Sequence, residues 1–313
     1  MMMLKRQFFV KPSSFLLIPI GLLWLLVQLP YPVFMRLGKC LGWLASFVPH
    51  YARTITKINL GLAFPALSQS ERTALLRKNY MSLGMSVLET AFAWFAPARR
   101  LEGLVEVAHE EVLSVREEHG VLVVLTHMHT LQIMIRLCAR RYQGISAVYR
   151  PHRKAVIERF NIRHLSSQLD EVIPRSDVRA MVRALRRKDM LMFLPDIDAG
   201  RDHSIFAPFF GVDTASVASV SKLTRLGKAK LVPLALIRKP DLSGYELRFG
   251  EVLQNYPSDE VLYDVTVVNA VMEAMIREHP DQYLWQYRRF NTRPEGELPF
   301  YPRKRKKSRK RMP

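Results

Sequence analysis

The sequence has 313 residues, a length that fits one large domain or two small ones. Hydrophobic residues make up 49% of it, which excludes a globally disordered chain. The formal net charge of +19 predicts an anionic partner, either anionic lipid, nucleic acid or an acidic protein. The two cysteines, Cys40 and Cys138, do not indicate a disulfide framework or a zinc site.

The first 35 residues are expected to form a membrane anchor. Residues 12–35 carry no charge, and roughly 20 apolar helical residues suffice to cross a bilayer. A cleaved signal peptide is the alternative, but Pro30 and Pro32 stand where a small-residue cleavage site would be needed. We therefore predict a retained N-terminal membrane helix, which Pro19 could bend into a tilted helix or a hairpin.

Two helices are predicted after the anchor. Residues 33–48 place apolar residues at helical spacing beside basic ones, a pattern typical of an amphipathic helix at a membrane interface. Residues 68–97 form a longer helical stretch, and Ser68 with Glu71 matches a capping box at its start.

Beyond residue 100, short β-branched runs alternate with helical segments, which predicts an α/β fold with a mixed central sheet flanked by helices. Strands are expected at residues 121–126, 144–149, 190–194, 230–237 and 245–249. Helices are expected at residues 131–142, 154–169, 178–187 and 263–279. The chain is thus divided into an anchor (1–35), a catalytic domain (36–300) and a basic tail (301–313).

In the tail, eight of residues 303–311 are Lys or Arg. Such a segment is either a solvated end or is attracted to anionic lipid on the cytoplasmic side of a membrane. No aromatic residues are interleaved with the charges, so nucleic-acid binding is not expected.

One group of residues predicts a catalytic site. The strand at residues 121–126 leads directly into His127, and Gln132 follows in the next helix. Polar residues at the carboxyl end of a buried strand are where α/β proteins place their sites, and a turn between strand and helix would let His127 and Gln132 meet. The alternatives are a structural histidine, or a metal pair of His127 with His129 for which no third ligand is evident.

Several blocks, in order along the chain, resemble the late (secondary) lipid A acyltransferases, whose signature is His, four residues, then Asp or Glu after a buried strand. The similar blocks are residues 53–65, 148–151, 195–200 with 206–212, and 285–296. The similarity covers nearly the whole length. It implies a fold like that of the glycerol-phosphate acyltransferases and an acyl-transfer activity.

The resemblance also implies a mechanism. In that family the histidine is a general base: it takes a proton from an acceptor hydroxyl, which attacks the thioester of an acyl carrier protein. Carried over, His127 is the base. Position 132 departs from the pattern, because a glutamine can orient the ring but brings no charge to stabilise the imidazolium. Gln132 could be an engineered isostere, or it could mark a natural low-activity or binding variant. Alternatively, Asp196 or Asp198 could take over the role of the acidic partner.

Four further residues are expected to bind substrate. Arg150 follows a strand and could hold a phosphate, a sugar acid or phosphopantetheine, or form a structural ion pair. Arg175 begins a series of arginines at helical spacing, either a solvated face or a dock for the acidic carrier protein. Asp196 and Asp198 follow a strand; a metal-binding pair is less favoured than a turn in which Asp196 aids the site.

Together these expectations describe an O-acyltransferase that uses acyl carrier protein as donor and a lipid A precursor as acceptor. It is expected at the bacterial inner membrane, with its catalytic domain facing the cytoplasm, as a monomer without metal or cofactor. Two alternatives stay open: a catalytically inactive lipid-binding homologue, and an acyltransferase for another lipid acceptor.

Overall fold

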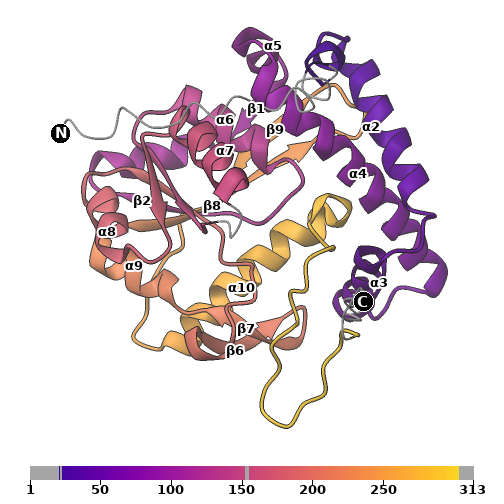
Figure 1. The fold of residues 1–313 in the computed structure, drawn as a ribbon. Helices are drawn as coiled ribbons and strands as arrows, with labels where there is room; N and C mark the ends of the chain where they lie inside the picture. The colour runs from indigo at the N-terminus through magenta and orange to yellow at the C-terminus, as the bar shows by residue number, and fades with distance from the viewer. Residues whose placement is uncertain (1–20, 22, 152–154, 303–313) are drawn as a thin grey trace, which may run out of the picture.

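The fold is known from a computed structural model that describes residue 21, residues 23–151 and residues 155–302 (Figure 1). Its main sheet has the strand order β1-β9-β8-β2-β5-β3-β4, in which only the β8–β9 pair is antiparallel. The strands are β1 (Val105–Ala108), β2 (Val121–Val124), β3 (Ile145–Tyr149), β4 (Glu171–Pro174), β5 (Met190–Phe193), β8 (Lys230–Arg238) and β9 (Tyr245–Phe249). The predicted mixed α/β sheet is therefore confirmed.

Helices cover both faces of this sheet (Figure 1). They are α2 (Tyr31–Ala45), α3 (Tyr51–Ala63), α4 (Gln69–Phe95), α5 (Ala98–Glu102), α6 (Leu131–Arg141), α7 (Ala155–Ser166), α8 (Val178–Arg186), α9 (Ser219–Gly227) and α10 (Val261–Glu278). The 3-10 helices of the described residues are η1 (Glu110–Glu117), η2 (Arg201–His203) and η3 (Pro280–Gln282). A separate antiparallel hairpin joins β6 (Ser204–Phe209) to β7 (Val212–Val217).

The central strand β2 is buried on both sides. Val121 and Val123 belong to one core cluster, which includes side chains of α4 and α6. Leu122 and Val124 belong to a second cluster, which includes side chains of α3, α8, α9 and α10. Because successive side chains of a strand point to opposite faces, a run of four apolar residues is required at this position.

The N-terminal helices α2 and α4 lie side by side at one edge of the molecule (Figure 1). Their backbones touch at glycines: a Cβ atom on Gly42 would lie 2.0 Å from the carbonyl oxygen of Tyr80, and one on Gly84 would lie 2.2 Å from that of Gly38. This contact fixes α2 against the fold and leaves its other side open. Exposed apolar residues on that side are Val33, Leu37, Leu41 and Leu44, with Phe47 and Val48 just beyond the helix.

Two N-terminal expectations can be compared with the structure. The capping box of α4 is confirmed, since the Ser68 hydroxyl accepts from the Glu71 N–H and the Glu71 carboxylate accepts from the Ser68 N–H. The membrane helix expected within residues 1–35 falls largely outside the described residues. In the part that is described, no helix is long and apolar enough to cross a membrane. The tail beyond residue 302 also lies outside the described residues.

Candidate active site

Two neighbouring parallel strands bring His127 and Asp196 together. In the register between β2 and β5, Val124 lies opposite Phe193, and each of the two polar residues follows three positions later. The Leu125 N–H donates to the Phe193 carbonyl at 2.9 Å, which extends the pairing beyond the strands. Carboxyl ends of parallel strands meet at one edge of a sheet, so the two side chains face each other there.

The contact between the two side chains has two points. The Asp196 Oδ1 atom lies 2.6 Å from His127 Nδ1, and Asp196 Oδ2 accepts from the His127 backbone N–H at 2.7 Å. An ionised carboxylate can only accept, so the ring hydrogen is on Nδ1 and Nε2 is left with a free lone pair. The Asp196 side chain is fully buried, whereas that of His127 is 31% exposed. The ring is thus fixed at Nδ1 by a buried carboxylate, while part of the side chain is exposed to solvent.

The charges of the pair stabilise each other. Burial lowers the pKa of His127, but the carboxylate of Asp196 raises it by more, so that the pKa lies above its ordinary value. Burial raises the pKa of Asp196, and the ring and backbone N–H of His127 lower it by more, so that the pKa lies below its ordinary value. The arrangement favours a charged carboxylate and an imidazole that accepts a proton readily.

Gln132 lies in the first turn of α6, half-buried. Its side chain makes no hydrogen bond with any residue that the structure describes, and the Nδ1 atom of His127 is bonded to Asp196 instead. Of the readings of position 132 set out above, the geometry agrees with the one in which another carboxylate orients the histidine. A catalytic role for Gln132 itself stays a prediction.

Arg150 and Arg175 lie along the same edge of the sheet. Strands β2, β5, β3 and β4 are consecutive and parallel, and Arg150 directly follows β3 as Arg175 directly follows β4. The Arg175 N–H donates to the Tyr149 carbonyl at 2.9 Å, so the register continues to the strand ends. Both arginines are exposed, and neither side chain pairs with an acid among the described residues. The edge therefore presents cations beside the His127–Asp196 pair.

Asp198 holds the loop that carries Asp196. One carboxylate oxygen accepts from the Thr292 N–H at 3.0 Å and from its hydroxyl at 3.1 Å. The other accepts from the Gly200 N–H at 2.9 Å. These bonds tie the loop to the C-terminal segment and account for the carboxylate, so the substrate contact predicted for Asp198 stays a prediction.

Two asparagines to which the sequence alone assigns no role, Asn59 and Asn79, hold the chain segment that packs against the site. Asn59 and Asn79 are fully buried, and each side-chain amide donates to two backbone carbonyls of residues 281–287, at 2.7 to 2.9 Å. The same segment contacts the histidine, because the Leu284 N–H donates to the His127 carbonyl at 3.0 Å. Helices α3 and α4 thus position the carboxyl end of β2 indirectly. Buried amides within apolar helical faces are the signal that could have revealed them.

His129 is a structural residue in this fold. Its Nδ1 atom lies 2.8 Å from the Ser82 hydroxyl, and its backbone N–H donates to the Gln282 carbonyl. Burial, and then the charge of Arg238, lower its pKa to about 3, so the ring is neutral. No group of three or more His, Cys, Asp or Glu in the described part of the chain is arranged to hold a metal ion.

Comparison with known proteins identifies the family. Residues 3–292 match the family described as bacterial lipid A biosynthesis acyltransferase. The chain is 39% identical over 285 residues to the lipid A biosynthesis lauroyltransferase of Escherichia coli K12, covering 88% of this chain and 91% of the relative. It is 37% identical over 288 residues to the palmitoleoyltransferase of the same strain, with 90% and 92% covered. For that strain's myristoyltransferase the identity is 25% over 288 residues, with 87% and 84% covered. The chain therefore belongs to the bacterial lipid A biosynthesis acyltransferase family and is an acyltransferase.

Proposed function

We propose that this protein moves a fatty acyl chain from the thioester of an acyl carrier protein to a hydroxyl group of a lipid A precursor. The relatives named above supply the acceptor class. The observation that carries the proposal is the His127–Asp196 pair, a partly exposed imidazole whose inner nitrogen is bonded to a buried carboxylate. This is the arrangement that general-base activation of a hydroxyl needs.

In the proposed reaction, His127 Nε2 takes the proton of the acceptor hydroxyl while the hydroxyl oxygen attacks the thioester carbonyl carbon. The new C–O bond forms, the C–S bond breaks, and the departing thiolate takes the proton from the imidazolium. Asp196 stabilises the imidazolium between these two transfers. The thioester supplies the driving force, so the step needs no nucleotide.

The arginines of the sheet edge are proposed to hold anionic groups of the substrates. Both arginines are exposed and lack acidic partners within the described residues. Arg150 follows β3, the strand next to that of Asp196, and Arg175 follows β4, one strand farther out. Arginine binds phosphate through two parallel hydrogen bonds, and both a lipid A precursor and phosphopantetheine carry phosphate. We place phosphate recognition there, beside the reacting hydroxyl.

A membrane location at the cytoplasmic face of the inner membrane is part of the proposal. The exposed apolar residues of α2 recur every three or four positions, which puts them in one stripe along the helix. A stripe of this kind, next to basic residues, is typical of a helix that lies in the headgroup region. It supports a protein that meets its lipid acceptor at the bilayer surface, and we propose that this protein acts as a monomer.

Mass spectrometry of lipid A from cells with and without the gene tests the proposal. An acyl chain missing from lipid A of the deletion strain, and restored by the wild-type gene, is expected. A lipid A profile that does not depend on the gene contradicts it.

Gln132 favours one second candidate function, a catalytically inactive lipid-binding protein. In that case neither the wild type nor Gln132→Glu forms product in an acyl-transfer assay.

A further inference from the structure

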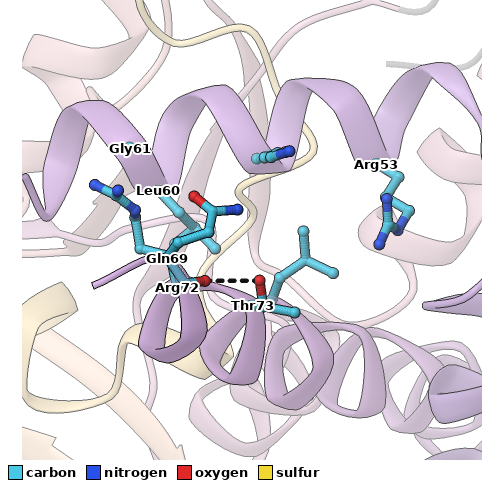
Figure 2. A pocket seen from close by; sticks show the side chains of 8 residues that line it. Arg53, Leu60, Gly61, Gln69, Arg72 and Thr73 are labelled. Carbon is cyan, nitrogen blue, oxygen red and sulfur yellow. Dashed lines mark hydrogen bonds between the residues drawn. The ribbon is translucent and has the colours of Figure 1, made fainter. Parts of the chain in front are cut away.

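Helices α3 and α4 enclose a cavity of about 250 Å³ that the catalytic pair does not use. Figure 2 shows it between the two helices, with Arg53 reaching in from α3 at one end and Arg72 from α4 at the other. The lining residues are Arg53, Lys57, Leu60 and Gly61 of α3, and Gln69, Arg72, Thr73 and Leu76 of α4. None of them belongs to the sheet edge that carries His127.

The charge of the cavity is entirely positive. Arg53, Lys57 and Arg72 line it, and no acidic side chain does. Arg53 uses its Nε to donate to the Ser46 carbonyl at 2.7 Å, which leaves its terminal amino groups without a partner among the described residues. The side chains of Lys57 and Arg72 form no hydrogen bond or ion pair with the described part of the chain. Three cations gathered around a hollow, without acids to neutralise them, favour an anionic ligand.

The size and the floor of the cavity narrow the class of ligand. A volume of about 250 Å³ has room for a phosphate with its adjoining carbon atoms. Leu60 and Leu76 form a buried apolar floor that suits those carbons. A Cβ atom on Gly61 would meet nothing within 4 Å, so this position opens onto free space.

The position of the cavity points to a membrane lipid. Through its bond to Ser46, Arg53 is joined to the turn that links α2 to α3. Phe47 and Val48 of that turn are 49% and 56% exposed, and they continue the apolar stripe of α2. The guanidinium of Arg77 lies 5.2 Å from the ring centre of Phe47, so cations already border this apolar surface. With the stripe in the bilayer surface, the cavity lies at the depth of lipid headgroups.

We propose that the cavity between α3 and α4 binds the phosphate of an anionic membrane lipid and anchors the protein at a site separate from the reacting lipid. The inference rests on the membrane location proposed above. An acidic protein such as the acyl carrier protein is a weaker candidate. A helix of a partner protein docks against cations that project from a surface, whereas a cavity between two helices admits one small group.

The test is binding of the full-length protein to vesicles of phosphatidylcholine with and without a minor fraction of phosphatidylglycerol. The variant Lys57→Gln/Arg72→Gln removes two charges from the cavity, and Arg183→Gln/Lys222→Gln removes two exposed charges from α8 and α9. A third variant, Gly61→Leu, keeps every charge and fills the cavity; it suits a helix interior and meets open space, so it is expected to fold. Circular dichroism confirms that all variants are folded.

The cavity variant is expected to bind phosphatidylglycerol vesicles on the order of tenfold or more weakly than wild type, since each basic residue near an anionic surface contributes about fivefold. Gly61→Leu is expected to weaken binding severalfold, and the α8–α9 variant to leave it near wild type. Inorganic phosphate is expected to compete only weakly, because it lacks the apolar contacts. Binding of both cavity variants that equals that of the α8–α9 variant overturns the inference, as does normal vesicle binding with lost affinity for acyl carrier protein.

Acyl transfer is measured in parallel, in detergent. If the wild type transfers acyl groups but the cavity variants bind vesicles as the wild type does, the anchor site is wrong and the proposed function stands. If vesicle binding depends on the cavity but no acyl transfer occurs, the proposed function is wrong and the anchor site stands.

Discussion

Replacing Asp196 by asparagine keeps the shape of the His127–Asp196 pair and removes the negative charge of its carboxylate. In the wild type, both carboxylate oxygens accept, one from the His127 ring and one from the His127 backbone N–H. Asparagine has one acceptor oxygen and one NH2 group, which can only donate. The backbone N–H cannot change its role, so it takes the amide oxygen, and the amide NH2 is turned toward Nδ1. The ring then carries its hydrogen on Nε2, where the acceptor hydroxyl must deliver a proton.

The expected effect is large and specific to turnover. In the serine-protease triad, the same change of tautomer with loss of the charge lowers kcat by about 10⁴, and we expect Asp196→Asn to lower kcat by roughly 10³ to 10⁴. KM is expected to change little, because Asp196 is buried behind His127. The assay is the initial rate of acyl transfer, measured over a range of donor and acceptor concentrations up to saturation. Asp202→Asn, an exposed change in the same loop, is the matched control.

The pH dependence gives a second readout of the same change. The general base must be neutral, so wild-type activity falls as the pH drops through the raised pKa of His127. Without the carboxylate this pKa falls, and the acid limb of the rate profile is expected to move to lower pH. Wild-type kcat in Asp196→Asn, or an acid limb that does not move, refutes the reasoning.

Three further changes test neighbouring parts of the structure. Gln132→Glu is expected to move the acid limb to higher pH with little change in kcat; a rise of several orders of magnitude in kcat would instead make position 132 the missing partner. Asn79→Ala leaves the Asp281 carbonyl without a donor and the Tyr283 carbonyl with only the Trp285 N–H, and should lower the free energy of unfolding by about 2 kcal/mol, measured by urea denaturation. In the wild type, the oxygens of the buried Glu89 carboxylate accept from the Arg238 guanidinium at 2.6 and 2.7 Å. Arg238→Met leaves that carboxylate without its cation and should lower the free energy of unfolding by roughly 3 to 5 kcal/mol in the same assay. The double variant Glu89→Leu/Arg238→Met should lower it much less, and an equal decrease in the two variants would contradict this account of the pair.

The sheet and its strongest helices could be predicted because hydrophobic pattern determines them directly. The run at residues 121–124 is apolar at every position, as a strand buried on both faces requires. The β6–β7 hairpin was not predicted. Its two-residue turn places Phe210 at a φ of 53° and Gly211 at 73°, and a phenylalanine in the left-handed region is not a recognisable turn signal. Phe209 and Phe210 are both buried.

The individual residues of the candidate site could be predicted from the sequence, but their arrangement in space could not. His127, Asp196 and Arg150 attract attention because a predicted strand precedes each of them, and Arg175 because it begins a series of arginines at helical spacing. What the sequence does not contain is the order of the strands: β5 inserts between β2 and β3, although β3 comes first along the chain. That order decides that Asp196, and not a residue of the following helix, meets the inner nitrogen of the ring. The asparagines that support the segment behind it depend on contacts more than two hundred residues apart.

Product formation by the purified enzyme tests the central claim most directly. Wild-type protein, given acyl carrier protein charged with a fatty acid and a lipid A precursor with a free hydroxyl, is expected to yield a lipid heavier by one acyl group in the mass spectrum. His127→Ala, shown to be folded, is expected to yield none above the uncatalysed background. Equal product from the two proteins would contradict the assignment of His127 as the base.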